Sequence, residues 1–329
     1  MLSRVAENIY WMSRYLERAA SVARLLDVNL ELALDLPGAP GTMWAPLVDV
    51  TGDRPLFNAA YGAPTMERVS HFLTLDMQYP NSIVSCMIKA RENARIVRDH
   101  LPMELWEEIN ALYHFVLQAA QSQEGAPSNP GAFYRHVKGS GMLLGGIAQD
   151  AMMEGELWRF FRAGRMLERA DKTSRILDVK YFILLPDVEY VGTPYDDIQW
   201  AALLRSLGGF QSYRRFYGRI SPANVVHMLV LDGAFPRSIR YCLGEADHSL
   251  RGLTGSAPGG YVNAAERVLG QVNAMLAYTE IDSIFLQGLH EFIDGLQARM
   301  NDVDAAIFET FFAPFPSAPG GNGSGRRTE

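Results

Sequence analysis

The residues with the clearest capacity for chemistry in this sequence are acidic and basic residues that occur twice, 151 positions apart. The matched pairs are Glu17 and Glu168, Arg18 and Arg169, Arg24 and Arg175, and Asp27 and Asp178. Arginine presents a planar fork of N–H groups to a carboxylate or phosphate, and glutamate can bind an amine or transfer a proton. If these side chains line one cleft, they would bind a charged small molecule or peptide, with Glu17 or Glu168 as acid or base.

The same residues also have two structural interpretations. Glutamate and arginine three or four positions apart on one helix form local ion pairs worth about 0.2–0.5 kcal/mol each. Alternatively, two related halves packed about a two-fold axis would bring their Glu-Arg elements together as a partly buried ion network. Such a network favours one specific packing without necessarily stabilising it. The sequence leaves the choice between a binding site and an ion network open.

These charged residues belong to a longer internal match. Nine of fifteen positions are identical between residues 14–28 and 165–179, and ten of 25 between residues 71–95 and 227–251. A repeat at this spacing indicates two copies of one unit. We therefore predict one domain over residues 1–313, built from pseudo-repeats at about 1–125 and 150–312. The two are expected to share one core, because such units rarely bury their apolar faces alone.

Helical periodicity indicates the elements that carry the motifs. Apolar residues recur at alternating three- and four-residue spacing, at Ile9, Met12, Leu16, Ala19, Ala23, Leu26 and Leu30. This pattern is typical of an amphipathic helix with a single core seam. The charged ridge Arg14, Glu17, Ser21 and Arg24, matched by Arg165, Glu168, Lys172 and Arg175, is expected to lie off that seam. No run of alternating strand residues occurs, so the predicted fold is all-α, a helical bundle.

Prolines and polar segments predict further boundaries. Pro80 and Pro236 stand where a helix could begin, because the first turn needs no proline N–H. Ser221 followed by Pro222 is typical of a cap and a first helical residue. Residues 314–329, rich in Gly, Pro and Ser, are predicted to form a disordered tail.

Other motifs carry weaker signals. Arg91, Arg95 and Arg98 fall on one predicted helix face with Glu92 alongside, and this face is either an anion site or a solvated surface. The string from Glu245 to His248 is one E-x-x-H element, which di-iron bundles use twice, but the other copy has Glu92 where the histidine would be. We therefore expect no metal site, and the sequence offers no motif for a cofactor.

Composition narrows the functional classes. The formal net charge is −7 and there is no basic arm, which argues against binding to nucleic acid or to an anionic membrane. Cys86 and Cys242 cannot form a disulfide framework, and a reducing cytoplasm fits this usage. Neither a secretory signal nor an apolar stretch of membrane-spanning length is apparent.

The doubled Glu-Arg strings resemble the alpha-E family, bacterial all-helical domains of unknown function named for a Glu-Arg motif. Residues 6–18, 81–95 and 164–178 carry the resemblance, which extends from Met1 to about Phe312. It implies association with a circularly permuted ATP-grasp ligase and a transglutaminase-like protein, encoded beside such domains or fused to them. ATP-grasp enzymes activate carboxylates as acyl phosphates and join them to amines. The family brings no assigned catalytic residues.

Two functional hypotheses follow. The first is a non-catalytic helical accessory protein of an amide-ligase or peptide-modification system, which docks the ligase or holds its substrate. The second is an enzyme that acts on a charged small molecule or peptide through the doubled Glu/Arg ridges. The geometry of the two Glu-Arg elements distinguishes them, because a site requires an open pocket and an ion network requires a closed interface.

Overall fold

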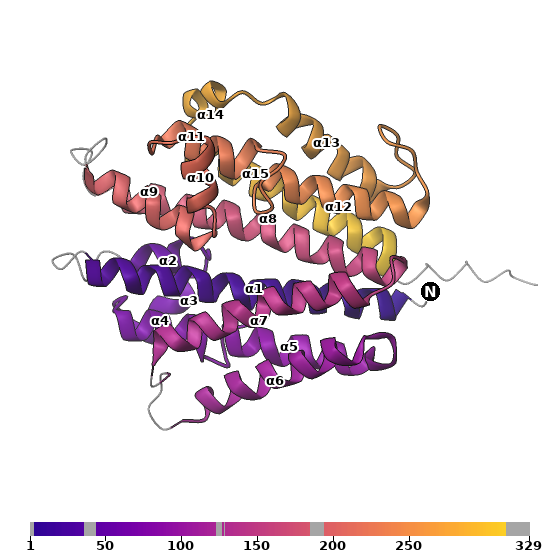
Figure 1. Cartoon of the computed structure of the whole chain (residues 1–329), viewed down its shortest axis with the longest axis horizontal. Coiled ribbons are helices and arrows are strands. Elements are labelled where there is room, and N and C mark those ends of the chain that lie inside the picture. The colour runs from indigo at the N-terminus through magenta and orange to yellow at the C-terminus, as the bar shows by residue number, and fades with distance from the viewer. Residues whose placement is uncertain (1–2, 36–43, 123–126, 128, 185–193, 314–329) are drawn as a thin grey trace, which may run out of the picture.

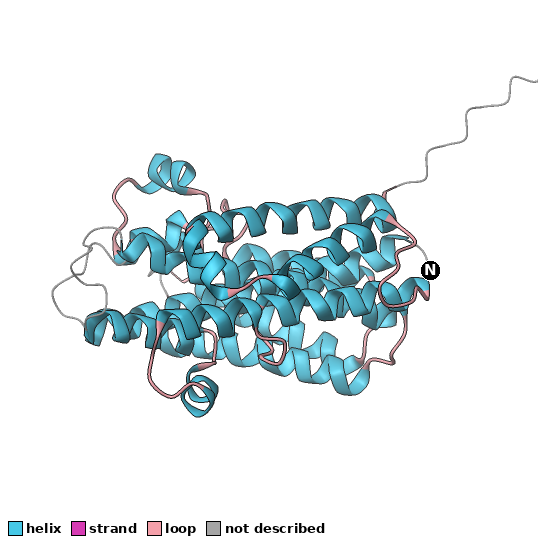
Figure 2. Ribbon diagram, turned by 90° about the horizontal axis from the view of Figure 1, so that it is seen from above, coloured by secondary structure: helices cyan, strands magenta, loops and turns pink. Residues whose placement is uncertain are grey.

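The computed structural model describes residues 3–35, 44–122, 127, 129–184 and 194–313. These residues form helices and connecting loops, with no strand among them (Figures 1 and 2). The all-α prediction is therefore confirmed. The predicted disordered tail, residues 314–329, lies outside the described residues.

The helices are α1 Ser3–Asp35, α2 Ala45–Asp49, α3 Arg54–Tyr61, α4 Met66–Thr74, α5 Ile83–Ile96, α6 Met103–Ala120, α7 Pro130–Ala151, α8 Glu156–Leu184, α9 Pro194–Ser206, α10 Phe210–Phe216, α11 Pro222–Val226, α12 Ile239–Thr254, α13 Ala264–Tyr278, α14 Ile281–Gln287 and α15 Leu289–Ile307. Short helical turns at His227–Leu231 and Phe308–Phe312 continue α11 and α15.

Two long helices, α1 and α8, form the middle of the molecule and run side by side (Figure 1). At 33 residues, α1 is about 50 Å long, given a rise of about 1.5 Å per residue. Helices α5 and α7 pack against α1, whereas α12 and α15 pack against α8. The chain thus places one group of helices on either side of the α1–α8 pair.

The burial of α1 differs from the sequence-based expectation. The predicted seam residues Ile9, Leu16 and Ala23 are buried, but so are the charged residues Arg14 and Glu17. The reason is that α1 contacts α5, α7, α8 and α9, so neighbours surround it instead of covering a single face. The charged ridge therefore lies inside the protein, where each charge needs a partner.

A glycine sets the close approach of α1 and α8. A Cβ atom at Gly164 would lie 2.5 Å from Oγ of Ser13 and 2.6 Å from the carbonyl oxygen of Tyr10. Only a residue without a side chain fits there, so the two backbones meet at this point. The turn of α8 that follows carries Arg165 and Glu168, and the close contact brings both to the α1 surface.

Serine caps begin two of the flanking helices. Oγ of Ser82 accepts a hydrogen bond from the N–H of Ser85 at 3.1 Å, and Oγ of Ser238 accepts one from Tyr241 at 3.0 Å. The preceding prolines occupy the turn before each helix, so the predicted starts were three residues too early. The start of α11 was predicted correctly, although the Ser221 side chain makes no capping hydrogen bond.

The buried apolar side chains form one continuous core that includes residues of α1, α5, α8 and α12. Cys86 and Cys242 lie within it as free, buried thiols. Among the described residues, no helix combines the length and apolar character needed to span a membrane.

Candidate functional site

The centre of the α1–α8 contact holds two buried glutamates. Glu17 on α1 has 4% of its surface exposed, and Glu168 on α8 has none. A carboxylate removed from water in this way requires compensating positive charge and hydrogen-bond donors. Both glutamates obtain two arginine partners from the opposite long helix.

Glu168 is held by two arginines of α1. Nε of Arg14 donates to Oε2 at 2.9 Å, and Arg18 donates to both carboxylate oxygens, at 2.6 Å from Nε and 2.9 Å from Nη2. Lys172, one turn along α8, adds an ammonium group at 3.5 Å. The Arg18 fork is thus a bidentate clamp, the strongest arrangement for an arginine–carboxylate pair.

Glu17 is held in the same way by two arginines of α8. Nε of Arg165 donates to Oε2 at 3.0 Å, and Arg169 donates to both oxygens at 2.9 and 3.0 Å. Arg237, from the turn before α12, donates to Oε1 at 3.1 Å. Each glutamate therefore uses the arginines that occupy matching positions in the other half of the sequence. We call this set of contacts the Glu-Arg layer: Arg14, Glu17, Arg18, Arg165, Glu168, Arg169 and Arg237.

The electrostatics of the layer keep both carboxylates ionised. Burial alone would raise the pKa of Glu17, but Arg169, Arg237 and Arg165 together hold it well below its usual value. Burial likewise opposes ionisation of Glu168, and Arg18, Lys172 and Arg14 outweigh it. Neither glutamate holds a proton to donate near neutral pH, and arginines engage the oxygens of both.

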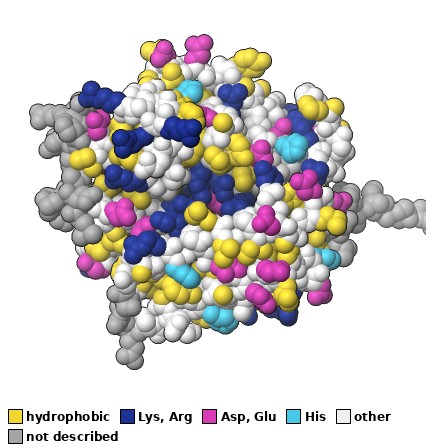
Figure 3. All heavy atoms as spheres, in the orientation of Figure 1, with side chains coloured by type: hydrophobic (Ala, Val, Ile, Leu, Met, Phe, Trp, Pro, Cys, Tyr) yellow, Lys and Arg dark blue, Asp and Glu magenta, His cyan; other side chains and the backbone are white. Residues whose placement is uncertain are grey.

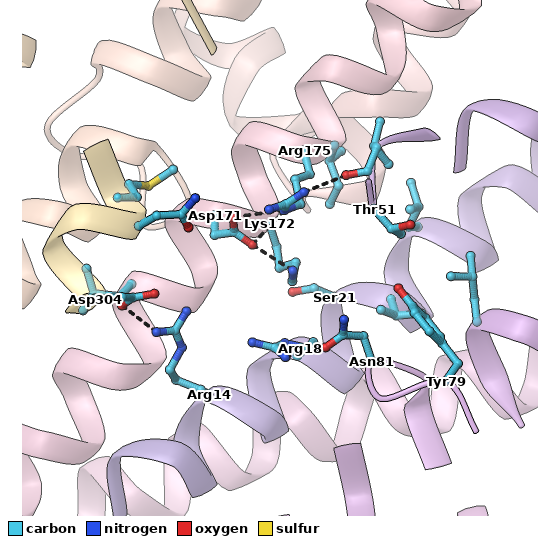
Figure 4. Close-up of a pocket in the computed structure, with 18 of the residues that line it drawn as sticks. Arg14, Arg18, Ser21, Thr51, Tyr79, Asn81, Asp171, Lys172, Arg175 and Asp304 are labelled. Atoms are coloured by element: carbon cyan, nitrogen blue, oxygen red, sulfur yellow. Dashed lines mark hydrogen bonds and ion pairs between the residues drawn. The ribbon is translucent and has the colours of Figure 1, made fainter. Parts of the chain in front are cut away.

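A cavity of about 290 Å³ adjoins the Glu168 side of the layer, between α1, α8, α15 and the segment after α2 (Figure 4). Its volume lies near the lower end of the range for small-molecule sites, about 300–1,000 Å³. The charged residues that line it are Arg14, Arg18, Asp171, Lys172, Arg175 and Asp304. The lining thus offers more positive than negative groups, with both signs present.

The two carboxylates of the cavity are fixed by pairing. At one end, Nη1 of Arg14 lies 2.5 Å from Oδ1 of Asp304. At the other, Nε of Arg175 donates to both oxygens of Asp171 at 3.0 Å, and Lys172 donates to the same residue at 2.8 Å. Burial would raise the pKa of Asp171, but Lys172 and Arg175 lower it to about 2. Figure 4 shows these groups around a common space.

The structure brings some of the predicted residues together and separates others. Glu17, Arg18, Glu168 and Arg169 meet in the layer, Arg175 lines the cavity, and Arg24 is buried near Glu17. Further along the two long helices, Asp27 pairs with Lys138 at 2.6 Å and Asp178 with His290 at 2.8 Å. These two aspartates anchor neighbouring helices and do not line the cavity.

The predicted cluster on α5 lies away from the layer. Glu92 pairs with Arg95 at 3.0 Å on an exposed face. Nε of Arg91 donates to Asn110 on α6 at 2.8 Å, and its guanidinium lies 4.6 Å from the centre of the Tyr113 ring. Arg91 therefore connects α5 to α6, and this contact favours a structural role for the face over an anion-binding site.

Three site residues were not predicted. Asp171 and Arg237 occupy positions where the matching copy has Ala20 and Asn81. The appearance of a charged residue in only one copy was the sequence signal that could have identified them as site residues. Asp304 comes from α15, and no sequence pattern connects it to α1.

The E-x-x-H string does not form part of the layer or of the cavity. Its Glu245 pairs with Arg162, whose Nε donates at 2.9 Å. Within the described ranges, no group of three or more His, Cys, Asp or Glu side chains is placed to hold a metal ion.

Comparison with known proteins gives a family but no activity. A family model, Alpha-E, described as a predicted alpha-helical domain with a conserved ER motif, matches residues 1–312. Uncharacterized proteins of Mycobacterium bovis and Mycobacterium tuberculosis are 26% identical over 342 residues, which cover 97% of this chain. The match spans only 37% of the length of these relatives. No solved structure matches the chain.

Proposed function

We propose, from the premise that this chain belongs to the Alpha-E family, that it is a non-catalytic helical partner of an ATP-grasp-type amide ligase. The observation that carries this proposal is the reciprocal pairing in the Glu-Arg layer. An acid or base must exchange a proton with a ligand, and Glu17 and Glu168 are instead ionised, buried and bound by arginines. The family's defining motif thus supports a rigid framework better than a catalytic centre.

The curated relatives support a role beside another module. Because the match covers 37% of their length, a region similar to this chain occurs there with further protein attached. A ligase of the bacterial cytoplasm, where ATP is available, is the partner that the family resemblance suggests, with a transglutaminase-like protein as a second member of the system. The reciprocal contacts of Glu17 and Glu168 also support the proposed architecture of two related halves.

The cavity suggests what this chain would contribute to the ligase, namely a binding site for one of the ligase's substrates. Lys172 and the arginines of the lining would attract a carboxylate, while Asp171 and Asp304 would attract an amine. A ligand with both groups, such as an amino acid or the end of a peptide, therefore fits the charges of the lining. Holding such a group next to a ligase would present one of its two substrates.

The test is complex formation and its effect on ligation. The full chain and its cognate ATP-grasp protein, mixed at micromolar concentrations, are expected to elute as one complex by size-exclusion chromatography with light scattering. The complex is expected to form amide bonds faster than the ligase alone. Separate elution at tens of micromolar, together with an unchanged ligation rate, would refute the proposal.

The alternative is an enzyme that acts on a ligand in the cavity. The observation that favours it is the cavity itself, with Asp171 and Lys172 in contact at its edge. The two functions differ in what the isolated chain does. Turnover of an amino acid or peptide by the chain alone, lost in Asp171→Asn but not in an Arg95→Gln control on the exposed face of α5, would establish the enzyme and exclude the non-catalytic role.

A further inference from the structure

The two ends of the Glu-Arg layer differ in their charge balance. On the Glu168 side, Asp171 and Asp304 add two carboxylates to the one in the layer. On the Glu17 side, one carboxylate, that of Glu17, lies among four arginines, Arg24, Arg165, Arg169 and Arg237. The Glu17 side therefore carries an excess of positive charge that its own residues do not neutralise.

Arg24 is the clearest sign of this imbalance. The residue is 6% exposed, and its Nε is buried with no hydrogen-bond partner. It forms no ion pair with any residue of the described ranges, whereas its counterpart in the sequence match, Arg175, binds Asp171 and the carbonyl oxygen of Val50. Asp27, one turn further along α1, pairs with Lys138 instead. Burial and the nearby Arg237 lower the pKa of Arg24 to about 9.

The packing of α7 explains why the chain does not supply a carboxylate here. The position that matches Asp171 is Ala20, and a Cβ atom on Gly141 of α7 would lie 2.6 Å from the Cβ of Ala20. The helices are too close at this point for an aspartate side chain. A Cβ on Gly145, one turn later, would overlap the guanidinium of Arg165. The close crossing of α7 and α1 thus keeps the cluster cationic.

We propose that Arg24, Arg165, Arg169 and Arg237 form a binding site for a phosphate group. Arginine forks match phosphate oxygens in geometry, and the unpartnered Nε of Arg24 requires an acceptor. The four arginines and Glu17 leave a net charge of +3. A single carboxylate would offset a third of it, whereas a phosphate, with a charge of about −1.5 to −2 near neutral pH, offsets half or more. Figure 3 shows Lys and Arg side chains gathered across the middle of one face, over the region where α8 lies beside α1. The side chains of Arg165 and Arg237 are 18% and 14% exposed, so the edge of the cluster reaches solvent.

The experiment measures binding of inorganic phosphate to the full chain by calorimetry and by thermal unfolding, in buffer whose ionic strength is held constant with NaCl. Arg24→Met is the site variant. Arg175→Met is the matched control, because Arg175 occupies the equivalent position but is paired with Asp171. Glycerol phosphate serves as a second probe, and comparable binding of it would show that the site accepts phosphate esters as well as the free ion.

The expected result is saturable stabilisation of the wild-type protein and of Arg175→Met by phosphate, with binding at least ten-fold weaker in Arg24→Met. Without phosphate, Arg24→Met is expected to melt at or above the wild-type temperature, because it removes a buried charge that has no partner. No saturable binding to the wild-type protein, or binding lost in Arg175→Met but kept in Arg24→Met, would overturn the proposal. If Arg24→Met does not fold, Arg24→Gln, compared with Arg175→Gln, provides the same comparison.

Discussion

Glu17 and Arg169 lie 152 residues apart in the sequence and form a bidentate pair, with distances of 2.9 and 3.0 Å, at the centre of the protein. Glu168 and Arg18 form the corresponding pair at 2.6 and 2.9 Å. The motif by which the family is recognised thus joins the two long helices to each other. Its first consequence is structural, since each pair fixes the position of α1 relative to α8.

Removal of one carboxylate from the layer is expected to destabilise the fold strongly. Glu17→Gln removes the negative charge that Arg165, Arg169 and Arg237 share and replaces one acceptor oxygen by an NH2 group. Breaking a buried ion pair from one side costs about 3–5 kcal/mol. Urea unfolding monitored by circular dichroism measures the change. Glu92→Gln removes a half-exposed carboxylate that pairs with Arg95 and is expected to cost no more than about 0.5 kcal/mol. If both substitutions lowered the free energy of unfolding by the same small amount, the Glu-Arg layer would contribute little to stability.

Acidic pH is expected to lower the free energy of unfolding, because Asp171, Glu17 and Glu168 must then take up protons. The folded pKa of Asp171 is about 2, below its usual value of 3.8, so the folded protein binds this proton more weakly than the unfolded chain does. The resulting stability is complete above pH 3.8 and is lost as the pH falls toward 2. Unfolding free energies measured between pH 7 and pH 2.5 should therefore fall most steeply below pH 4. A smaller loss over that range is expected for Asp171→Asn, and an unchanged acid profile would contradict this assignment.

The α1–α8 contact is expected to be intolerant of a methyl group at one glycine. Gly164→Ala places a Cβ against Ser13 and a backbone oxygen of Tyr10, and overpacking of this kind costs about 1–3 kcal/mol. Gly146→Ala on α7 is the control, because a Cβ there would meet no side chain and no other helix within 4 Å, and alanine favours a helix over glycine by about 1 kcal/mol. The melting temperature should fall for Gly164→Ala and stay level or rise for Gly146→Ala. A higher melting temperature for Gly164→Ala than for Gly146→Ala would refute the close approach of α1 and α8.

The two thiols are expected to be unreactive until the protein unfolds. Burial raises the pKa of Cys86 to about 11 and that of Cys242 to about 12, and the thiolate is the reactive form. Labelling with a thiol reagent at pH 8 should modify neither residue in native buffer and both in guanidinium chloride. If one thiol reacts in part, the variant Cys86→Ser shows which one it is, because only Cys242 remains in that variant. Rapid labelling of the native protein would show that the core opens around these residues.

Some of this structure could be predicted from the sequence. The alternating three- and four-residue spacing of Ile9, Met12, Leu16, Ala19 and Ala23 predicted a helix and its buried seam, because residues at this spacing share one face of a helix. The internal match identified Glu17 and Glu168 as related residues. One interpretation of that match, an ion network formed where two halves meet, describes the contacts that the structure contains.

Other features could not be predicted, since they depend on which helices become neighbours. Local spacing suggested that Glu17 would pair within its own helix or face a cleft, whereas its partners come from α8 and from the turn before α12. The contribution of Asp304 to the cavity depends on the packing of α15. The unpartnered state of Arg24 depends on the crossing of α7 at Gly141.

The sequence by itself thus determined the helical class, the duplicated charges and the family. Only the tertiary structure decided that those charges are buried, that each glutamate is bound by the opposite helix, and that one side of the layer retains excess positive charge. The physical reason is that periodicity specifies which residues share a face of one helix. Burial and pairing depend instead on distances between helices, and these are set by contacts such as Gly164 against Tyr10, between residues far apart in the chain.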